Sequence, residues 1–462
     1  MSDILIAHLK QSVALVANQA PMLVGFSGGL DSSVLLHLLR AQLPERSISA
    51  IHVNHGLSPH ADQWQEHCRQ WADALGVSFV AERVNVRQAG SGLEDAARAA
   101  RYSAFAKHLP KGGILLLGHH GDDQAETVLL RLLRGAGPKG LAAMEPLRVF
   151  EQGYLLRPLL AVSRSDLERY ARDHQLDWIE DESNHSDQFD RNFLRNEVMP
   201  RLLQRWPSCV ETINRNAQLV RQYDQLAEIL ASEDCQDCGL KPARVGQYID
   251  ISRWRQWPAI RRANALRYLL RQQHLPEPSQ AIMAQIDNQF FASNPRPDSN
   301  PVVTWGGVSV RLYDEKLYFV ANPQDCQDRL EHALAGTTQT HQEQQQHAVH
   351  LSWSGQAPLS LPGGGELILK PGGHFAWQGE ALTVGFRQGG ERAQPFGRAH
   401  SQTLKKLLQE YKLEPWLRSC VPIIHSSNQI AAVGDVWIEQ AFYEADENQG
   451  YRIEWRPGTG KI

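Results

Sequence analysis

The chain has 462 residues, with 47 Lys or Arg against 51 Asp or Glu and a formal net charge of −4. At about 150 residues per domain, this length predicts roughly three domains and is ample for a large core. The net charge by itself does not indicate a nucleic-acid-binding protein. The composition, 42% hydrophobic and 21% charged, is that of an ordinary globular protein.

No apolar run approaches the roughly 20 residues of a membrane span, and the N-terminus mixes Asp3, His8 and Lys10 into its apolar residues, unlike a signal peptide. The six cysteines are scattered, with one close pair at Cys235 and Cys238, a pattern that suits a reducing compartment. We therefore expect a cytoplasmic protein with no membrane contact.

A glycine- and serine-rich stretch follows the first strong strand signal. Residues 22–24 (Met-Leu-Val) predict a buried strand, and residues 34–39 predict a helix packed on a sheet. Between them runs Phe-Ser-Gly-Gly-Leu-Asp-Ser-Ser, residues 26–33. Glycines permit close backbone approach, and a helix start points N–H groups at an anion. The stretch predicts an anion site; the alternative is a serine-rich turn with Asp31 as a helix cap.

Two familiar phosphate loops do not match this stretch. No Lys-Ser/Thr follows the glycines, which excludes a Walker A loop, and Gly-x-Gly-x-x-Gly is absent. The string Ser-Gly-Gly-Leu-Asp-Ser instead resembles the pyrophosphate loop of enzymes that adenylate a substrate with ATP and release pyrophosphate.

Strand and helix signals then alternate along the first part of the chain. Residues 48–53, 77–80 and 114–117 predict further strands, separated by helices at 63–75 and 93–109. The fold class expected is α/β, with a doubly wound, mostly parallel sheet. Asn54 and His55 follow the second strand, where a nucleotide could lie, although polar residues are common in such loops.

A second polar loop follows the strand at 114–117. It holds His119, His120, Asp122, Asp123 and Glu126. Asp123-x-x-Glu126 has the spacing of a capping box, with Asp accepting from the first turn and Glu reaching back. Crowded carboxylates at a strand end also suit a cationic substrate or a metal. Zinc is disfavoured because adjacent histidines diverge and no cysteine is near.

The helix predicted at 93–109 carries Glu94, Arg98 and Arg101. Glu94 and Arg98 are four residues apart and would form a surface pair, which the sequence alone favours. Arg98 and Arg101 share a face, and the alternative is that they clamp the phosphates of a nucleotide.

We divide the chain into a catalytic domain at 1–210, a mostly helical domain at 211–325, a linker at 326–348 and a small strand-rich domain at 349–462. In the helical domain, residues 254–274 carry five arginines, two tryptophans and no acid, a pattern of RNA binding or of a solvated helix face. A hairpin is expected at 302–313 and 316–320. The last domain holds a basic helix at 401–411.

Five segments stand in a fixed order along the first domain: residues 27–32, 52–55 (His-Val-Asn-His), 93–98 (Leu-Glu-Asp-Ala-Ala-Arg), 118–127 and 191–195 (Arg-Asn-Phe-Leu-Arg). Together they resemble the successive motifs of the tRNA(Ile)-lysidine synthetases, within the pyrophosphate-loop ATPase superfamily. Residues 387–392 and 405–408 are similar to the accessory domain of the longer bacterial form. One departure is Ser58, where the family leads us to expect arginine.

The resemblance implies an adenine nucleotide alpha hydrolase-like fold and an ATP-dependent ligase. Such an enzyme adenylates the wobble cytidine of a CAU-anticodon tRNA(Ile) at the oxygen on carbon 2. The ε-amine of free L-lysine then attacks that carbon and expels AMP, giving lysidine, which reads AUA.

The resemblance also implies roles for residues. Asp123 and Glu126 would bind lysine, and one of them would take the proton from the attacking amine. Asp31 would hold magnesium, and Arg98 and Arg101 would face ATP or the adenylate. The domains at 211–325 and 349–462 would hold the tRNA through their basic faces. The phosphates of ATP would lie on Ser27, Gly28, Gly29, Leu30, Asp31 and Ser32.

Three other functions fit parts of the sequence. A tRNA thiolase would need cysteines near the active site, whereas Cys235 and Cys238 lie in an acidic segment outside the catalytic domain. An amidotransferase-coupled ligase would need a glutaminase domain or partner. A non-catalytic nucleotide- or RNA-binding module would not need the acidic loop. Whether the protein is a monomer or a homodimer is left open.

Overall fold

The structure is a computed structural model, and it describes residues 2–17, 19–56, 58–85, 93–180, 190–236, 240–292, 301–321, 350–362 and 364–458. The predicted linker at 326–348 and Cys238 lie outside these ranges. The chain divides into two compact units, Met1–Leu226 and Ala227–Ile462. No helix in the described ranges is both long enough and apolar enough to cross a lipid bilayer.

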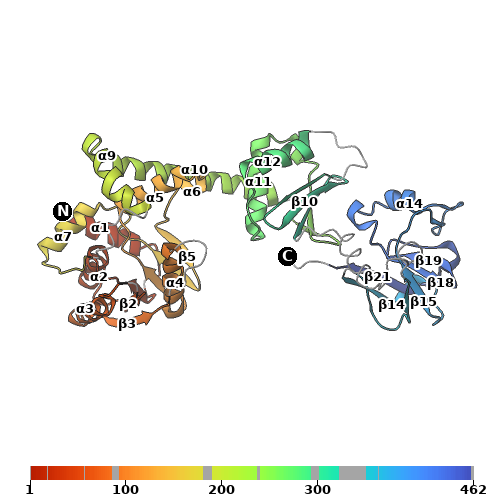
Figure 1. The fold of residues 1–462 in the computed structure, drawn as a ribbon, viewed down its shortest axis with the longest axis horizontal. Helices are drawn as coiled ribbons and strands as arrows, with labels where there is room; N and C mark the ends of the chain where they lie inside the picture. The colour runs from red at the N-terminus through yellow and green to blue at the C-terminus, as the bar shows by residue number, and fades with distance from the viewer. Residues whose placement is uncertain are drawn as a thin grey trace. The chain divides into compact units, whose positions relative to one another are not determined.

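The first unit is built on a six-stranded sheet in the order β3-β2-β1-β4-β6-β5 (Figure 1). All neighbouring strands are parallel except the β5–β6 pair. The strands are β1 Met22–Gly25, β2 Ile48–Asn54, β3 Ser78–Arg83, β4 Ile114–Leu116, β5 Leu147–Phe150 and β6 Gly153–Leu156. The predicted doubly wound, mostly parallel sheet is confirmed.

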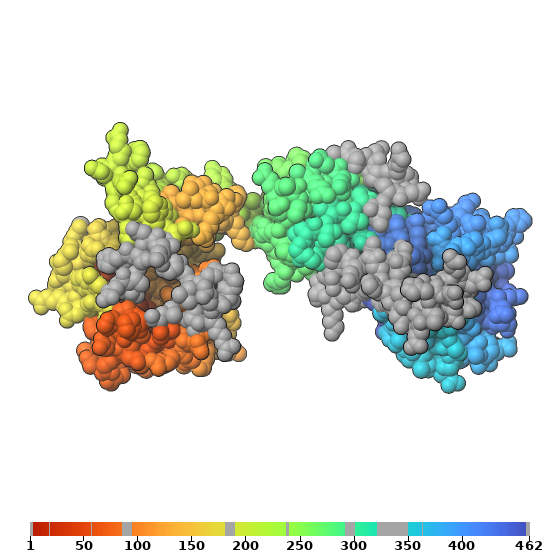
Figure 2. All heavy atoms as spheres, viewed as in Figure 1, coloured from red at the N-terminus to blue at the C-terminus, as the bar shows by residue number. Residues whose placement is uncertain are grey.

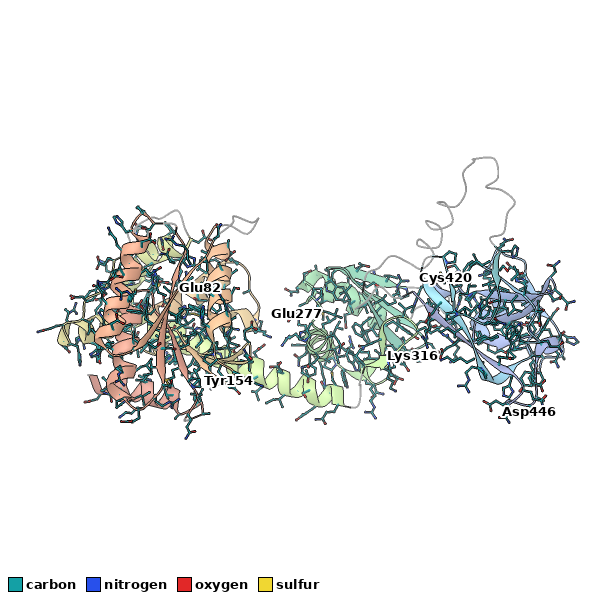
Figure 3. All side chains as sticks on the ribbon, turned by 90° about the horizontal axis from the view of Figure 1, so that it is seen from below. Glu82, Tyr154, Glu277, Lys316, Cys420 and Asp446 are labelled. Carbon is teal, nitrogen blue, oxygen red and sulfur yellow. The ribbon has the colours of Figure 1, made fainter. Side chains whose placement is uncertain are left out.

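Helices cover both faces of this sheet because alternate strand residues point to opposite sides. Met22 and Val24 join the larger core cluster, whereas Leu23, between them, joins the cluster on the other face with Phe105 and Leu115. Figure 3 draws the described side chains on the ribbon. The helices are α1 Ser2–Val13, α2 Leu30–Gln42, α3 Ala61–Ala74, α4 Leu93–His108, α5 Gly121–Leu133, α6 Pro138–Leu141, α7 Arg164–Asp173, α8 Asp190–Phe193, the π-helix η2 Leu194–Val198, α9 Met199–Arg205 and α10 Cys209–Gln236.

The second unit begins with a five-stranded antiparallel sheet, β7-β8-β11-β10-β9, packed with helices. The predicted hairpin is present, but the run expected as one strand at 302–313 is two strands. Gly306 and Gly307, at φ +50° and +80°, form the turn that divides it. The elements are β7 Lys241–Pro242, β8 Gln247–Asp250, η3 Trp254–Gln256, α11 Ala259–Gln272, α12 Gln280–Asp287, η4 Asn288–Ala292, β9 Val302–Trp305, β10 Val308–Tyr313 and β11 Lys316–Ala321.

The chain ends in a strand-rich region, drawn in blue in Figures 1 and 2. Two sheets, β12-β15-β18-β19-β20 and β13-β14-β21, and the small pair β16–β17 surround its core. The predicted basic helix is present as α14 Leu404–Glu410. The other elements are β12 Leu351–Trp353, β13 Leu359–Ser360, β14 Gly365–Phe375, β15 Leu382–Gly385, β16 Arg392–Ala393, β17 Gln402–Thr403, η5 Pro415–Leu417, β18 Ile423–Ser426, β19 Gln429–Val433, β20 Trp437–Ile438, η6 Gln440–Phe442 and β21 Tyr451–Pro457.

Candidate active site

The predicted anion loop lies in the turn between β1 and α2. Gly28 has φ +84°, and a Cβ there would lie 2.7 Å from Ile179 Cδ1 and 2.8 Å from Cys68 Sγ. Any side chain would be both strained and crowded at this position. Gly29 is the extended N-cap of α2, so the free N–H groups of the first helical turn point out of the loop.

The serine hydroxyls hold the loop in this shape. Ser32 Oγ donates to the carbonyl of Gly29 at 3.0 Å and lies 3.2 Å from Ser27 Oγ. Ser27 is exposed and Ser32 is buried. The side chain of Leu30 belongs to the hydrophobic core, so only its backbone is available to a ligand.

Asp31 lies in the first turn of α2 with a carboxylate that is incompletely bonded. Its Oδ1 atom is buried and has no hydrogen-bond partner among the described residues. Burial raises the pKa of this carboxyl, although the nearby His120 opposes the shift. An orphaned carboxylate oxygen beside an anion loop fits a hard divalent cation such as magnesium, which needs only one or two protein carboxylates.

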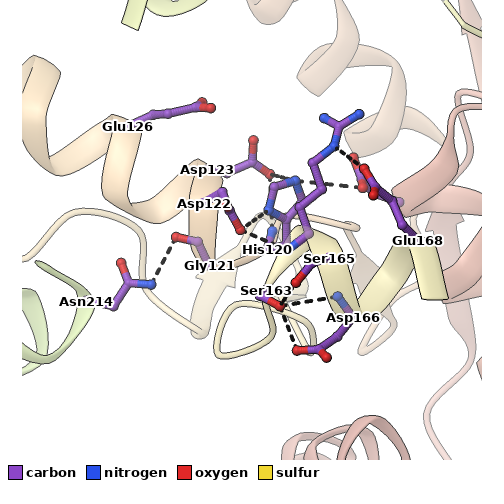
Figure 4. Close-up of polar contacts among 12 residues, drawn as sticks. His120, Gly121, Asp122, Asp123, Glu126, Ser163, Ser165, Asp166, Glu168 and Asn214 are labelled. Atoms are coloured by element: carbon purple, nitrogen blue, oxygen red, sulfur yellow. Dashed lines mark hydrogen bonds and ion pairs between the residues drawn. The ribbon is translucent and has the colours of Figure 1, made fainter. Parts of the chain in front are cut away.

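The second polar loop packs directly against the first. A Cβ on Gly118 would lie 2.9 Å from the backbone oxygen of Asp31. His120, the N-cap of α5, lies between the two loops. Its Nε2 is 3.7 Å from Asp31 Oδ1 and 3.4 Å from Asp123 Oδ2, and its Nδ1 is 3.5 Å from Asp122 Oδ2 (Figure 4). One buried imidazole therefore joins the anion loop to the acidic loop.

The capping interaction differs from the predicted one. Asp123 is the third residue of α5, and its Oδ2 accepts a hydrogen bond from the backbone N–H of His120 at 3.1 Å. Asp123 is thus the residue that reaches back, and Glu126, one turn further along, has two arginine partners instead. The capping box does not account for Glu126.

Those partners are Arg191, in α8, and Arg195, in the adjoining π-helix η2. Asp123 Oδ1 accepts from the Nη2 atoms of both arginines at 2.9 Å. Glu126 accepts from Arg191 Nε at 2.8 Å and from Arg195 Nε at 2.7 Å. Glu126 is 2% exposed, so the pair of carboxylates is buried and balanced by two guanidinium groups. π-Helical turns occur frequently at functional sites.

The contacts among these residues shift the pKa values of Asp123 and His120. Burial alone would raise the pKa of Asp123, but His120 and the arginines hold it well below its usual range. Burial would likewise lower the pKa of His120, yet Asp123, Asp122 and Asp31 together raise it. The site therefore presents ionised carboxylates beside cations.

His119 lies on the other side of the same loop and behaves differently. Burial, opposed by Asp123 and assisted by Arg157, lowers its pKa to about 3. Arg157 Nε donates to His119 Nδ1 at 3.2 Å. Arg98 acts electrostatically on His119, and its guanidinium lies 5.0 Å from the ring centroid of Tyr102.

Asn54, the last residue of β2, and His55, which follows it, were expected where a nucleotide could lie. Asn54 donates to Asp62 Oδ1 at 3.0 Å and accepts from the N–H of Gly56 at 2.9 Å, so it fastens its own loop. Burial lowers the pKa of His55 to about 4, with help from Arg101, which keeps that ring neutral.

The sequence did not single out Arg191, Arg195 or His120 as site residues, although Arg191 and Arg195 stood in a family motif. Asn214 was also missed, and it donates to the carbonyl of Gly121 at 2.9 Å (Figure 4). The partners of Arg191, Arg195 and Asn214 are 65 to 93 residues away in sequence, so no local pattern marks these three residues, whereas His120 lies beside its partners Asp122 and Asp123. Within the described part of the chain, no group of three or more His, Cys, Asp or Glu is arranged to hold a metal ion.

Comparison with known proteins identifies the family. A model described as the PP-loop domain matches residues 1–202, one described as the TilS substrate binding domain matches 249–318, and one described as the TilS substrate C-terminal domain matches 382–455. The tRNA(Ile)-lysidine synthase of Xanthomonas axonopodis pv. citri is 41% identical over 94% of each chain. That of Serratia proteamaculans is 38% identical over 94% of this chain and 95% of its own.

The chain belongs to the tRNA(Ile)-lysidine synthase family. Among solved structures, a U34-tRNA thiolase of Methanococcus maripaludis is 16% identical and aligns with a TM-score of 0.42, covering 47% of this chain and 78% of that one, a likeness too low to bear on function. The family membership confirms the resemblance drawn from the ordered motifs, and the residues matched by the PP-loop domain model, 1–202, include the turn that holds Gly28.

Proposed function

We propose that this protein is an ATP-dependent ligase that joins L-lysine to the wobble cytidine of a CAU-anticodon tRNA(Ile). The observation that carries the proposal is the position of His120, within 3.7 Å of Asp31 in the anion loop and 3.4 Å of Asp123 in the acidic loop. An adenylating site and an amine-binding site must adjoin for one activated base to pass through both steps.

In the first step, the cytosine oxygen attacks the α-phosphorus of ATP, and pyrophosphate leaves. The N–H groups at the start of α2 and the Ser27 hydroxyl would hold the phosphates. Asp31 would hold magnesium, which offsets negative charge on the departing pyrophosphate. The anticodon base is single-stranded and can be splayed out of its stack at little cost.

In the second step, the lysine ε-amine attacks carbon 2 of the cytosine, and AMP leaves. Asp123 and Glu126 would bind an ammonium group of lysine, and Arg191 and Arg195 would then be free to meet its α-carboxylate. The four side chains thus match both charges of an amino-acid head group. The depressed pKa of Asp123 makes it a partner for charge rather than a proton acceptor, because a general base works best with a pKa near the operating pH.

A thiolase is disfavoured by the thiols nearest the site. Burial raises the pKa of Cys68, beside Gly28, to about 12, and burial and Glu211 raise that of Cys209. Both stay protonated at neutral pH, whereas sulfur transfer needs a thiolate.

Single-turnover labelling tests the proposal. Radioactive lysine and ATP are given to two transcripts, a CAU isoleucine tRNA and the CAU elongator methionine tRNA. We expect label on the isoleucine transcript alone, with AMP released in equal amount. Tight ATP binding with no label on either RNA would contradict the proposal and favour a thiolase or a non-catalytic binder.

A further inference from the structure

Three aromatic rings form a stack in the strand-rich C-terminal region. The rings of Phe396 and Tyr443 are 3.5 Å apart between centroids and inclined by 5°, and the rings of Tyr443 and His374 are 5.0 Å apart and inclined by 17°. Phe396 lies in the turn between β16 and β17, Tyr443 follows η6, and His374 lies in β14. Three segments far apart in sequence thus supply one column of rings.

The backbone around the stack is fastened. The N–H of Phe396 donates to the carbonyl of Ile438 at 3.0 Å, and the N–H of Gly397 donates to Gln440 Oε1 at 3.0 Å. His374 Nδ1 lies 2.9 Å from the carbonyl oxygen of Glu444. The terminal ring is therefore already ordered, and a ligand that used it would lose little conformational entropy.

Phe396 ends the stack and is 47% exposed. Because Tyr443 covers one face of its ring, the exposed area lies on the other face and the edge. Among the described residues of 350–458, the large apolar side chains that are exposed are Phe396 and Tyr411. The ring is thus an isolated flat surface rather than part of the broad apolar patch that a protein partner would need.

The segment of the chain that carries Phe396 is basic in sequence. Residues 387–412 contain six Lys or Arg against two Glu, and both acids are already engaged. Glu391 accepts from the N–H of Gly389 at 3.0 Å, and Glu410 pairs with Arg398 at 2.6 Å. Lys405 and Lys406, on α14, are exposed.

We propose that Phe396 is a stacking platform for an unpaired nucleobase of the RNA substrate, with Arg392, Lys405 and Lys406 facing the phosphates on either side of that base. The proposal rests on the proposed function for the identity of the RNA. A flat aromatic ring beside cations is the arrangement by which proteins hold unstacked bases.

The test compares Phe396→Ala with Phe396→Trp in the full-length protein. Dissociation constants for the CAU isoleucine tRNA transcript are measured at one fixed salt concentration, because phosphate contacts make affinity depend on salt. We expect Phe396→Ala to weaken binding about ten-fold and Phe396→Trp to bind within about two-fold of the wild type, since the loss of one base stack has this size. Equal affinities for Phe396→Ala and wild type would overturn the proposal, as would equal weakening by both substitutions.

Two further measurements separate the possible outcomes. Lysine incorporation by the wild type tests the proposed function. If Phe396→Ala binds tRNA weakly but the wild type forms no lysidine, the stacking role of Phe396 is supported and the proposed ligase activity is contradicted. Sedimentation of each variant tests whether Phe396 instead contacts a second copy of the protein. A changed oligomeric state with an unchanged tRNA affinity would contradict the proposed stacking role. Lys405→Ala should make the tRNA affinity less dependent on salt concentration, by the amount expected for the loss of about one phosphate contact.

Discussion

The anion loop after β1 and the acidic loop after β4 occupy equivalent places in the sheet, yet they are built differently. The first is made by backbone: Gly28 takes a left-handed conformation with no room for a Cβ, and Gly29 starts α2. The second is made by side chains, with two carboxylates held by arginines 65 to 72 residues further along the chain. A site made by backbone is complete within a few residues, whereas a site made by ion pairs is complete only in the folded protein.

The largest effect should come from the ion pairs. Glu126→Gln leaves Arg191 and Arg195 with one carboxylate, and we expect the lysine-dependent rate to fall at least about 100-fold while ATP binding persists. Stability should fall by about 2 to 3 kcal/mol, less than for a fully buried pair, because the two guanidinium side chains are 26% and 28% exposed.

The matched control is Glu82→Gln in β3 (Figure 3), where the carboxylate lies 2.6 Å from Lys107 Nζ and 2.8 Å from His108 Nε2 near the surface. Lys107 is 64% exposed, so the Glu82→Gln substitution should destabilise the protein less than Glu126→Gln does and leave lysine use intact. Urea unfolding and lysine titrations of both variants provide the measurement. Similar losses of stability and of lysine use from the two substitutions would show that the buried ion pairs of Glu126 have no special role.

A smaller effect is expected in the anion loop. Gly28→Ala should destabilise the protein by about 1 to 2 kcal/mol through the left-handed backbone alone, and more if Ile179 and Cys68 cannot move aside. Gly29→Ala is the companion variant, because φ there is −75° and the nearest atom, Ser27 Oγ, would be 3.5 Å away. Thermal unfolding should separate the two, and equal losses would show that the loop conformation imposes no constraint.

The acidic loop should also respond to pH through His119. Its pKa is lowered in the folded protein, so its contribution to stability is present above the unfolded value of about 6.5 and is lost as the pH falls toward about 3. Between pH 7 and pH 5, wild type should lose on the order of 1 kcal/mol more than His119→Gln. Unfolding curves across this range check the difference, and parallel curves would contradict it.

The smallest effect on stability should come from Arg98. Its side chain is exposed and lies over Tyr102, so Arg98→Ala should change the free energy of unfolding by less than about 0.5 kcal/mol. If Arg98 faces ATP, the KM for ATP should rise several-fold with the KM for lysine unchanged. An unchanged KM for ATP would reassign Arg98 to the surface of α4.

The sequence was sufficient to predict those parts of the fold that depend on residues close together in the chain. The strand, loop and helix around Gly28 follow from an apolar run, glycines and a helix start, and the parallel sheet follows from alternating elements. The glycine pair at 306–307 was overlooked, and one strand was therefore expected where a turn separates β9 from β10.

The partners of the carboxylates in the candidate site could not be predicted from the sequence, because they are long-range contacts. Asp123 and Glu126 were found as a pair, but the spacing also matched a capping box, and only the contacts of Arg191 and Arg195 separate the two interpretations. Asn54 shows the converse, since a polar residue at a favourable strand end is used to hold Asp62 and Gly56.

Cys68 gives the anion loop an internal reporter. Its side chain is fully buried against Gly28, and its high pKa keeps it in the unreactive thiol form. An alkylating reagent reaches the Cys68 thiol when the loop opens away from α3. The rate of Cys68 modification therefore measures the frequency of local opening of the anion loop. We expect ATP to slow this labelling by holding the loop closed, so that nucleotide binding can be followed in the native enzyme without attaching a dye.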